Sequence, residues 1–411
     1  MHRFFVMDTY QPRSDLSYWN LDALELWARH KVDGILEKKN VSARINDVSR
    51  MAVIKLDAEG DNHILWLKPS ARTIERLSLK SMEITRHHAW AAQELFIDLT
   101  MDQSVDAVVK ENWLYALVRS NQKYYIRRYR VIANALLPYP EILIDSQDLL
   151  PGSRLKVGTS RRGTTRAYLS IPGKNQFASI DLASKKTESL TVQMPENYGA
   201  LSSEIDFCID TWKDTLVVAD SVHHCVVEID CKSGKAQVIC GTGSPGNAPE
   251  QTVAEKAQLN SPSSVAIYRP NEVVPDKHLT DPSRVFLTMD PDRIRPRTIL
   301  VADSGNLRIK KIVELPFDVS YLLGVQDESF IYTLIGSGSE SGAKFPRVTP
   351  QHKADLRSYP IPKPSKLLTT RSGELIVYFR AEQTFLVLKP ASALEMKARE
   401  GASKDMDTTN P

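Results

Sequence analysis

The sequence predicts an all-β fold, a single six-bladed β-propeller of four-stranded antiparallel blades. Short apolar segments recur about every 50 residues, a spacing that is typical of propeller blades. The first four start 50, 53 and 49 residues apart, and two more follow after 83 and 76 residues: His63–Lys68, Trp113–Val118, Arg166–Ile171, Thr215–Asp220, Thr298–Asp303 and Glu374–Phe379. The two longer intervals indicate insertions of roughly 30 residues rather than missing blades.

Most of these segments are followed by a second apolar run that can pair with them as a hairpin. Such runs are Tyr124–Arg130, Gln176–Asp181, Val226–Asp230 and Thr384–Leu388. The last blade lacks a fourth strand, because nothing after Pro390 reads as one. We expect an N-terminal strand, Arg3–Asp8, to complete that blade and close the ring, which removes open sheet edges.

The segment after this strand has a different pattern. Leu21, Leu24, Trp27 and Ala28 follow Asn20 at helical spacing, which predicts a helix over about 20–38. The alternative is that residues 3–38 form most of a seventh, irregular blade. Residues 1–390 are predicted to be one domain, and the polar tail 391–411 to be partly disordered.

The composition argues against several classes of partner. The 411 residues are 42% hydrophobic and 25% charged with a net charge of +3, so a large core can form. The whole chain is expected to have no strong nonspecific attraction to nucleic acid or anionic lipid, and no DNA partner is expected. No run of 18 apolar residues occurs, and Met1–Asp8 has no signal-peptide core. We therefore expect a soluble, cytoplasmic protein without a membrane partner.

A glycine-rich turn is followed by two apolar strands with polar turn residues at their ends. These segments are Gly241–Gly246, Leu259–Ile267 and Ile299–Ile309. This pattern resembles an NHL repeat, the unit of one family of β-propellers. The resemblance implies structural roles for the hairpin-corner residues Asp220, His224, Asp303, Asn306 and Arg308.

The same glycines match the dinucleotide-binding pattern Gly-x-Gly-x-x-Gly. That chemistry requires a helix to begin at the glycines so that its amide groups face a pyrophosphate. Pro245 and Pro249 interrupt the segment, so no cofactor is expected.

All four cysteines lie in the predicted fourth blade, where a disulfide, a metal site or simple burial could explain them: Cys208, Cys225, Cys231 and Cys240. Their spacing fits no zinc motif, so burial is favoured. His223 and Cys225 are the metal-ligand candidates, but a tetrahedral site needs four converging ligands, and no metal is predicted.

Two features are candidates for binding. The run Lys123–Arg130 alternates cations with aromatics, as in single-strand binders, and it gives RNA candidates together with two later arginines: Tyr125, Arg127, Arg128, Arg130, Arg161 and Arg162. The insertions 269–296 and 337–362 are long loops, which often carry binding sites, and the first contains the candidates Arg293 and Arg295.

These observations favour a non-catalytic scaffold that presents loops to a protein partner. The first alternative is an RNA-binding propeller, as the resemblance to NHL proteins with a basic face implies. The second is a metal-dependent lyase or hydrolase at the central channel, as in propeller lyases. No three histidines recur at matching blade positions, and no Gly-x-Ser-x-Gly motif is present, so an enzyme is not favoured.

Overall fold

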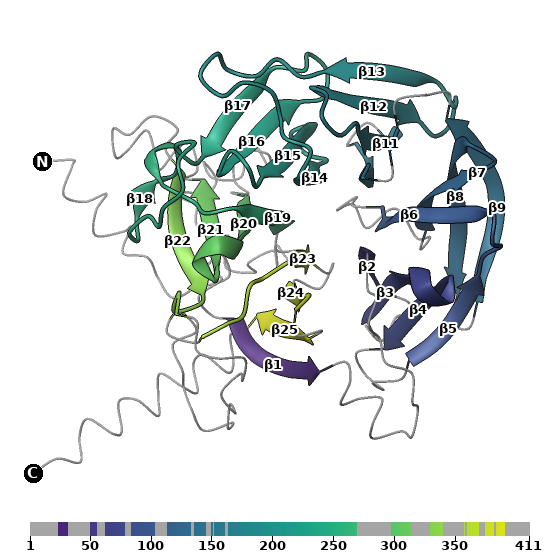
Figure 1. Cartoon of the computed structure of the whole chain (residues 1–411), viewed down its shortest axis with the longest axis horizontal. Helices are drawn as coiled ribbons and strands as arrows, with labels where there is room; N and C mark the ends of the chain where they lie inside the picture. Colours follow the sequence, from purple (N-terminus) through teal and green to yellow (C-terminus); the bar gives the residue numbers. More distant parts are fainter. Residues whose placement is uncertain are drawn as a thin grey trace, which may run out of the picture.

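The computed structural model arranges six antiparallel sheets as a ring around a central axis (Figure 1). It describes residues 24–31, 50–55, 62–78, 84–102, 113–132, 135–144, 149–150, 152–160, 163–268, 297–314, 329–339, 357, 360–369, 375–381 and 384–390. The prediction of an all-β propeller is confirmed. Within the described residues no helix is long and apolar enough to cross a membrane.

Sheets one to four follow the chain order, and each begins with its innermost strand. Sheet one has β2 (Arg50–Lys55), β3 (Asn62–Lys68), β4 (Thr73–Ser78) and β5 (Ile84–Ala89); sheet two has β6 (Glu94–Met101), β7 (Trp113–Ser120), β8 (Lys123–Ile132) and β9 (Ala135–Ile144). Sheet three has β10 (Leu155–Thr159), β11 (Thr165–Ser170), β12 (Gln176–Asp181) and β13 (Thr187–Thr191). Sheet four has β14 (Ile205–Asp210), β15 (Thr215–Asp220), β16 (Cys225–Asp230) and β17 (Ala236–Cys240).

Sheet five differs from the predicted four-stranded blade. To β19 (Pro262–Tyr268), β20 (Thr298–Asp303), β21 (Arg308–Glu314) and β22 (Ser329–Ile335) it adds β18 (Thr252–Val253), which pairs with β22. Sheet six has β23 (Lys366–Thr369), β24 (Leu375–Phe379), β25 (Thr384–Pro390) and β1 (Leu24–Lys31). Short 3-10 turns occupy Pro69–Ala71, Ala254–Lys256 and Ser304–Asn306.

The core lies between the sheets. Both faces of the second strands are apolar, so β15 and β20 are buried at every position. In β15, Leu216 and Val218 pack with Phe177 of sheet three, whereas Val217 and Ala219 pack with sheet five. Each sheet therefore needs a neighbour on both sides, as expected for a repeat architecture.

Aspartates end several strands and set the tight turns that follow. Asp181, Asp210, Asp220 and Asp230 each accept hydrogen bonds from the backbone N–H groups two and three residues later. This side-chain turn replaces backbone pairing where the strand stops. It explains why Asp recurs at the ends of the predicted strands.

The ring closes by pairing of the two ends of the chain. β1, drawn in purple, lies antiparallel to β25, drawn in yellow, from Leu24 opposite Pro390 to Lys31 opposite Thr384 (Figure 1). An N-terminal strand thus completes the last sheet, but the expected donor Arg3–Asp8 lies outside the described residues.

The predicted helix over 20–38 is wrong over Leu24–Lys31, because these residues form β1. The free edge of β25 offers backbone hydrogen bonds that outweigh a short helical pattern. These eight residues belong to sheet six and not to a separate seventh blade. The insertion 269–296, most of 337–362 and the tail 391–411 lie outside the described residues.

Deletion of residues 1–31 tests this closure. We expect a lower midpoint of thermal unfolding and the formation of higher oligomers, because β25 loses its partner strand and exposes its edge. Calorimetry and light scattering measure both effects, with deletion of 391–411 as the control. Unchanged stability after the N-terminal deletion would contradict the closing role of β1.

Candidate functional site

Sheet two carries the largest group of exposed apolar side chains among the described residues. Its outer strands β8 and β9 have ten residues each, whereas β12 and β13 of the neighbouring sheet three have six and five. The difference of four or five residues corresponds to roughly 13 Å of strand. Sheet three therefore covers only part of the face that sheet two turns toward it.

On this face of sheet two, the residues that sheet three covers and the residues that it leaves exposed lie one after the other along β8 and β9. Tyr124 and Ile126 of β8 belong to the core shared with sheet three. Because side chains two apart lie on one face, Arg128, Arg130 and Ile132 continue this face toward the β8–β9 hairpin. These three are half-buried or exposed, and Ile132 is 41% exposed.

Strand β9 adds Leu137 and Tyr139 to this face, and they are 42% and 41% exposed. A register shift opposite Ile126 and Arg128 keeps Tyr139 on the same side as Ile142. The Tyr139 ring meets Trp113 edge-on at 4.5 Å between centroids. We call this surface the hairpin ledge and define it by six residues: Trp113, Arg128, Arg130, Ile132, Leu137 and Tyr139.

The arginines of the ledge lie beside these apolar groups. Among the described residues, the Arg128 side chain donates to Pro140 O at 3.5 Å, the long limit of a hydrogen bond, and Arg130 is exposed. Tyr, Trp and Arg are the residues that dominate protein–protein interfaces. The ledge therefore has the composition of a docking surface on a rigid sheet.

The predicted Tyr/Arg run is divided between the two faces of β8. Tyr125 and Arg127 face sheet one, while Arg128 and Arg130 face sheet three. Arg127 forms ion pairs with Glu94 and, at 3.0 Å, with Glu141. The run thus does not form one basic, aromatic surface, because alternate residues of a strand point to opposite sides.

Four further predicted binding residues lie outside the described residues: Arg161, Arg162, Arg293 and Arg295. The sequence analysis missed Trp113, Ile132, Leu137 and Tyr139. The sequence does contain a signal for Leu137 and Tyr139. Residues 135–144 have apolar side chains at both odd and even positions, although an outer strand usually has one polar face.

The hairpin corners have the hydrogen bonds that a structural role requires. Asp303 accepts from Asn260 N at 2.7 Å and from Asn306 Nδ2 at 2.8 Å. Burial raises the pKa of Asp303 to about 6, although these hydrogen bonds act to lower it. The charged carboxylate therefore reduces the stability of the folded state at neutral pH. This loss disappears as the pH falls through about 6, because the carboxylate becomes protonated. Arg308 instead donates to Asn247 Oδ1 and Ser337 O.

The corner of sheet four repeats this arrangement. Asp220 accepts from Ser202 N at 2.9 Å and lies 2.9 Å from His223 Nδ1. His224 adopts a left-handed conformation with φ of 51°, and its Nδ1 accepts from Ser261 N at the start of sheet five. His224 therefore connects two sheets.

The metal candidates do not converge. His223 Nδ1 is engaged by Asp220, and Cys225 is fully buried, which raises the pKa of its thiol to about 12 and disfavours the thiolate that binds metals. Within the residues described, no three His, Cys, Asp or Glu side chains are placed to hold a metal ion. Cys208, Cys231 and Cys240 are free thiols, as is Cys225.

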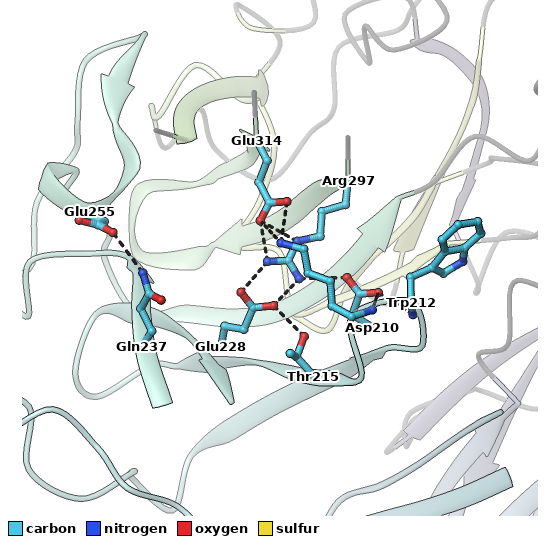
Figure 2. A network of polar contacts seen from close by, with 9 residues as sticks. Asp210, Trp212, Thr215, Glu228, Gln237, Glu255, Arg297 and Glu314 are labelled. Atoms are coloured by element: carbon cyan, nitrogen blue, oxygen red, sulfur yellow. Dashed lines mark hydrogen bonds and ion pairs between the residues drawn. The ribbon is translucent and has the colours of Figure 1, made fainter. Parts of the chain in front are cut away.

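A buried ion network anchors the chain where the 269–296 insertion ends. Figure 2 shows the Arg297 guanidinium among three carboxylates, at 2.9 Å from Asp210, 2.5 Å from Glu228 and 2.6 Å from Glu314. Arg297 is 1% exposed. Burial alone would raise the pKa of Glu228, but the hydrogen bonds and charge of Arg297 outweigh it and hold that pKa below its usual value. The network links sheets four and five.

Comparisons with known proteins support the fold. No protein-family model and no curated protein matches the chain. Among solved structures, a structural genomics protein of unknown function from Bacteroides thetaiotaomicron is 11% identical with a TM-score of 0.55, over 85% of this chain and 70% of that one. An auxiliary nutrient binding protein from the same organism is 11% identical with a TM-score of 0.49, over 84% and 69%. At this identity, similarity concerns the β-propeller fold alone.

Replacing Arg297 tests the buried network. Arg297→Met leaves three carboxylates without their cation, so we expect a loss of about 3–5 kcal/mol in the free energy of unfolding. Arg166→Met is the control, because its pair with Glu188 is 35% and 44% exposed and should contribute little to stability.

The effect of Arg297→Met should depend on pH. Because the pKa of Glu228 is lowered in the folded state, the stabilisation is present above the unfolded pKa of about 4.3 and is lost as the pH falls through the folded value. Urea unfolding at neutral and acidic pH measures the difference. An equal loss at both values would contradict the ionic origin.

Proposed function

We propose that this chain is a non-catalytic protein-interaction scaffold that docks a partner on the hairpin ledge. The observation that carries the proposal is the exposed Ile132, Leu137 and Tyr139 surface, which lies on a sheet fixed by its neighbours. A preformed surface loses little conformational entropy when a partner binds. Contiguous exposed apolar side chains typically mark interaction sites.

The ledge favours a protein segment that combines large apolar and acidic side chains. Apolar groups would cover Leu137 and Tyr139, and carboxylates would pair with Arg128 and Arg130, which lie on the same face. Addition of a strand to β9 is not favoured, since Pro138 and Pro140 lack the backbone N–H donors that an added strand requires.

RNA binding has less support from the same residues. Tyr124 and Tyr129 are buried, so they offer no stacking platform, and the charge of Arg127 is offset by Glu94 and Glu141. The cytoplasm remains our expected compartment, because four free thiols suit a reducing environment.

The ledge is tested with Leu137→Ser/Tyr139→Ser in the full chain. Selection from a random peptide library on the wild-type protein should enrich peptides with acidic and large apolar residues. We expect at least tenfold weaker binding of these peptides to the double variant, because the apolar contact area is lost. Val222→Ser is the matched control, since Val222 is 54% exposed on sheet four.

The outcomes separate the candidate partners. Both variants should keep the thermal midpoint of the wild type, because the side chains are exposed. Peptides that bind the double variant as tightly as the wild type would contradict the ledge. A salt-sensitive mobility shift of single-stranded RNA, lost in Arg128→Gln/Arg130→Gln, would favour the RNA alternative instead.

We also propose that the ring is of the NHL type. The support is the repeated corner, in which Asp220 and Asp303 each accept from a backbone N–H that precedes the innermost strand of their own sheet. The two blades use the same device despite different neighbouring residues.

The corner aspartates of both sheets should contribute to stability. Asp220→Ala and Asp303→Ala each leave buried donors unsatisfied, so we expect losses of about 1–3 kcal/mol in the free energy of unfolding. Asp181→Ala, at an exposed turn, is the control with a smaller expected loss. Chemical denaturation measures all three, and a loss at one corner only would argue against a common repeat.

A further inference from the structure

A cavity of about 40 Å³ lies on the ring axis. The innermost strand of every sheet contributes to its lining: Met51, Asp98, Lys156, Asp206, Ser263 and Lys366. By volume it admits about three water molecules or a group of a few atoms. The lining is polar although the ring around it is apolar.

The lining has more positive than negative charge. With Arg154 and Arg380 there are four cations, and the acids are Asp98 and Asp206. Asp206 is already engaged, because Lys366 Nζ lies 2.6 Å from both of its oxygens and Ser264 Oγ donates to it at 2.6 Å. Asp98 accepts from Leu155 N at 2.7 Å.

Lys156 is the unusual member of this lining. It is 6% exposed, and it forms no hydrogen bond or ion pair with any residue that the structure describes. Its charge attracts Asp206, but both oxygens of that carboxylate are already bonded by Lys366, so no group of the described residues bonds to the Lys156 ammonium directly. Buried charges normally have a direct partner. Burial also lowers the pKa of Lys366 to about 8 although Asp206 lies beside it, as expected where positive charge is in excess.

Arg154 offers further donors at the same place. Its Nε donates to Ile205 O at 3.5 Å, and its terminal nitrogens form no hydrogen bond or ion pair within the described part of the chain, so they can contact a ligand. A guanidinium beside an ammonium matches the geometry of a phosphate or carboxylate group.

We propose that the axial cavity binds a small oxyanion, a phosphate or carboxylate group, through Lys156 and Arg154. The anion would give Lys156 a direct hydrogen-bond partner and would balance the excess of cations. This site lies at the innermost strands, apart from the hairpin ledge on the outer strands of sheet two, so either site can exist without the other.

Thermal unfolding and calorimetric titration of the full chain with inorganic phosphate or acetate, at constant ionic strength, test the site. The wild type should be stabilised in a saturable manner, since a ligand that binds the folded state raises its stability. The anion with the lower Kd identifies the group that the cavity prefers.

Lys156→Met separates binding from folding. We expect this variant to unfold at a higher temperature than the wild type without anion, because the repulsion between Lys156 and Lys366 is removed, and to bind phosphate at least tenfold more weakly. Lys232→Met is the control, because Lys232 is an exposed turn lysine outside the cavity and should respond to phosphate as the wild type does.

Two results would overturn the proposal. One is the absence of a saturable response of the wild type to either anion, and the other is an equal response of Lys156→Met and the wild type. If Lys156→Met does not fold, Arg154→Gln provides the same test, since Arg154 is half-buried and its replacement retains hydrogen-bond donors.

Discussion

The burial of both faces of every sheet is the constraint on which this structure depends. A strand such as β15, buried at all six positions with apolar side chains on both faces, cannot leave either side in water, so each sheet requires two neighbours. An open row of sheets would always leave two faces exposed. The ring solves this problem, and pairing of β1 with β25 joins its ends.

The same constraint determines where charge is tolerated. Arg297 is buried but lies among three carboxylates, and Asp206 is buried but paired with Lys366. The opposite charges of these groups are paired within the protein, so they hold neighbouring sheets together and do not indicate a ligand. Lys156 differs because, among the described residues, it attracts Asp206 without a hydrogen bond or ion pair of its own, and this contrast makes the axial cavity a candidate for binding.

The hairpin ledge arises where consecutive sheets are unequal. β8 and β9 are longer than the strands of sheet three that they face, so apolar residues that would otherwise be interior lie at the surface. In a repeat fold, one sheet with longer outer strands than its neighbour has a surface that the other sheets lack. The scaffold and the docking surface thus have the same physical origin.

The sequence by itself determined the propeller and its second strands, because apolar runs such as Thr215–Asp220 and Thr298–Asp303 reflect local alternation and burial. It did not predict β1, whose strand conformation depends on the edge of β25, more than 350 residues away in the chain. It also grouped Arg127 with Arg128, although adjacent residues of a strand point to opposite faces. Only the tertiary structure placed Lys156 beside Asp206 and Lys366, because closing a ring brings distant innermost strands to one axis.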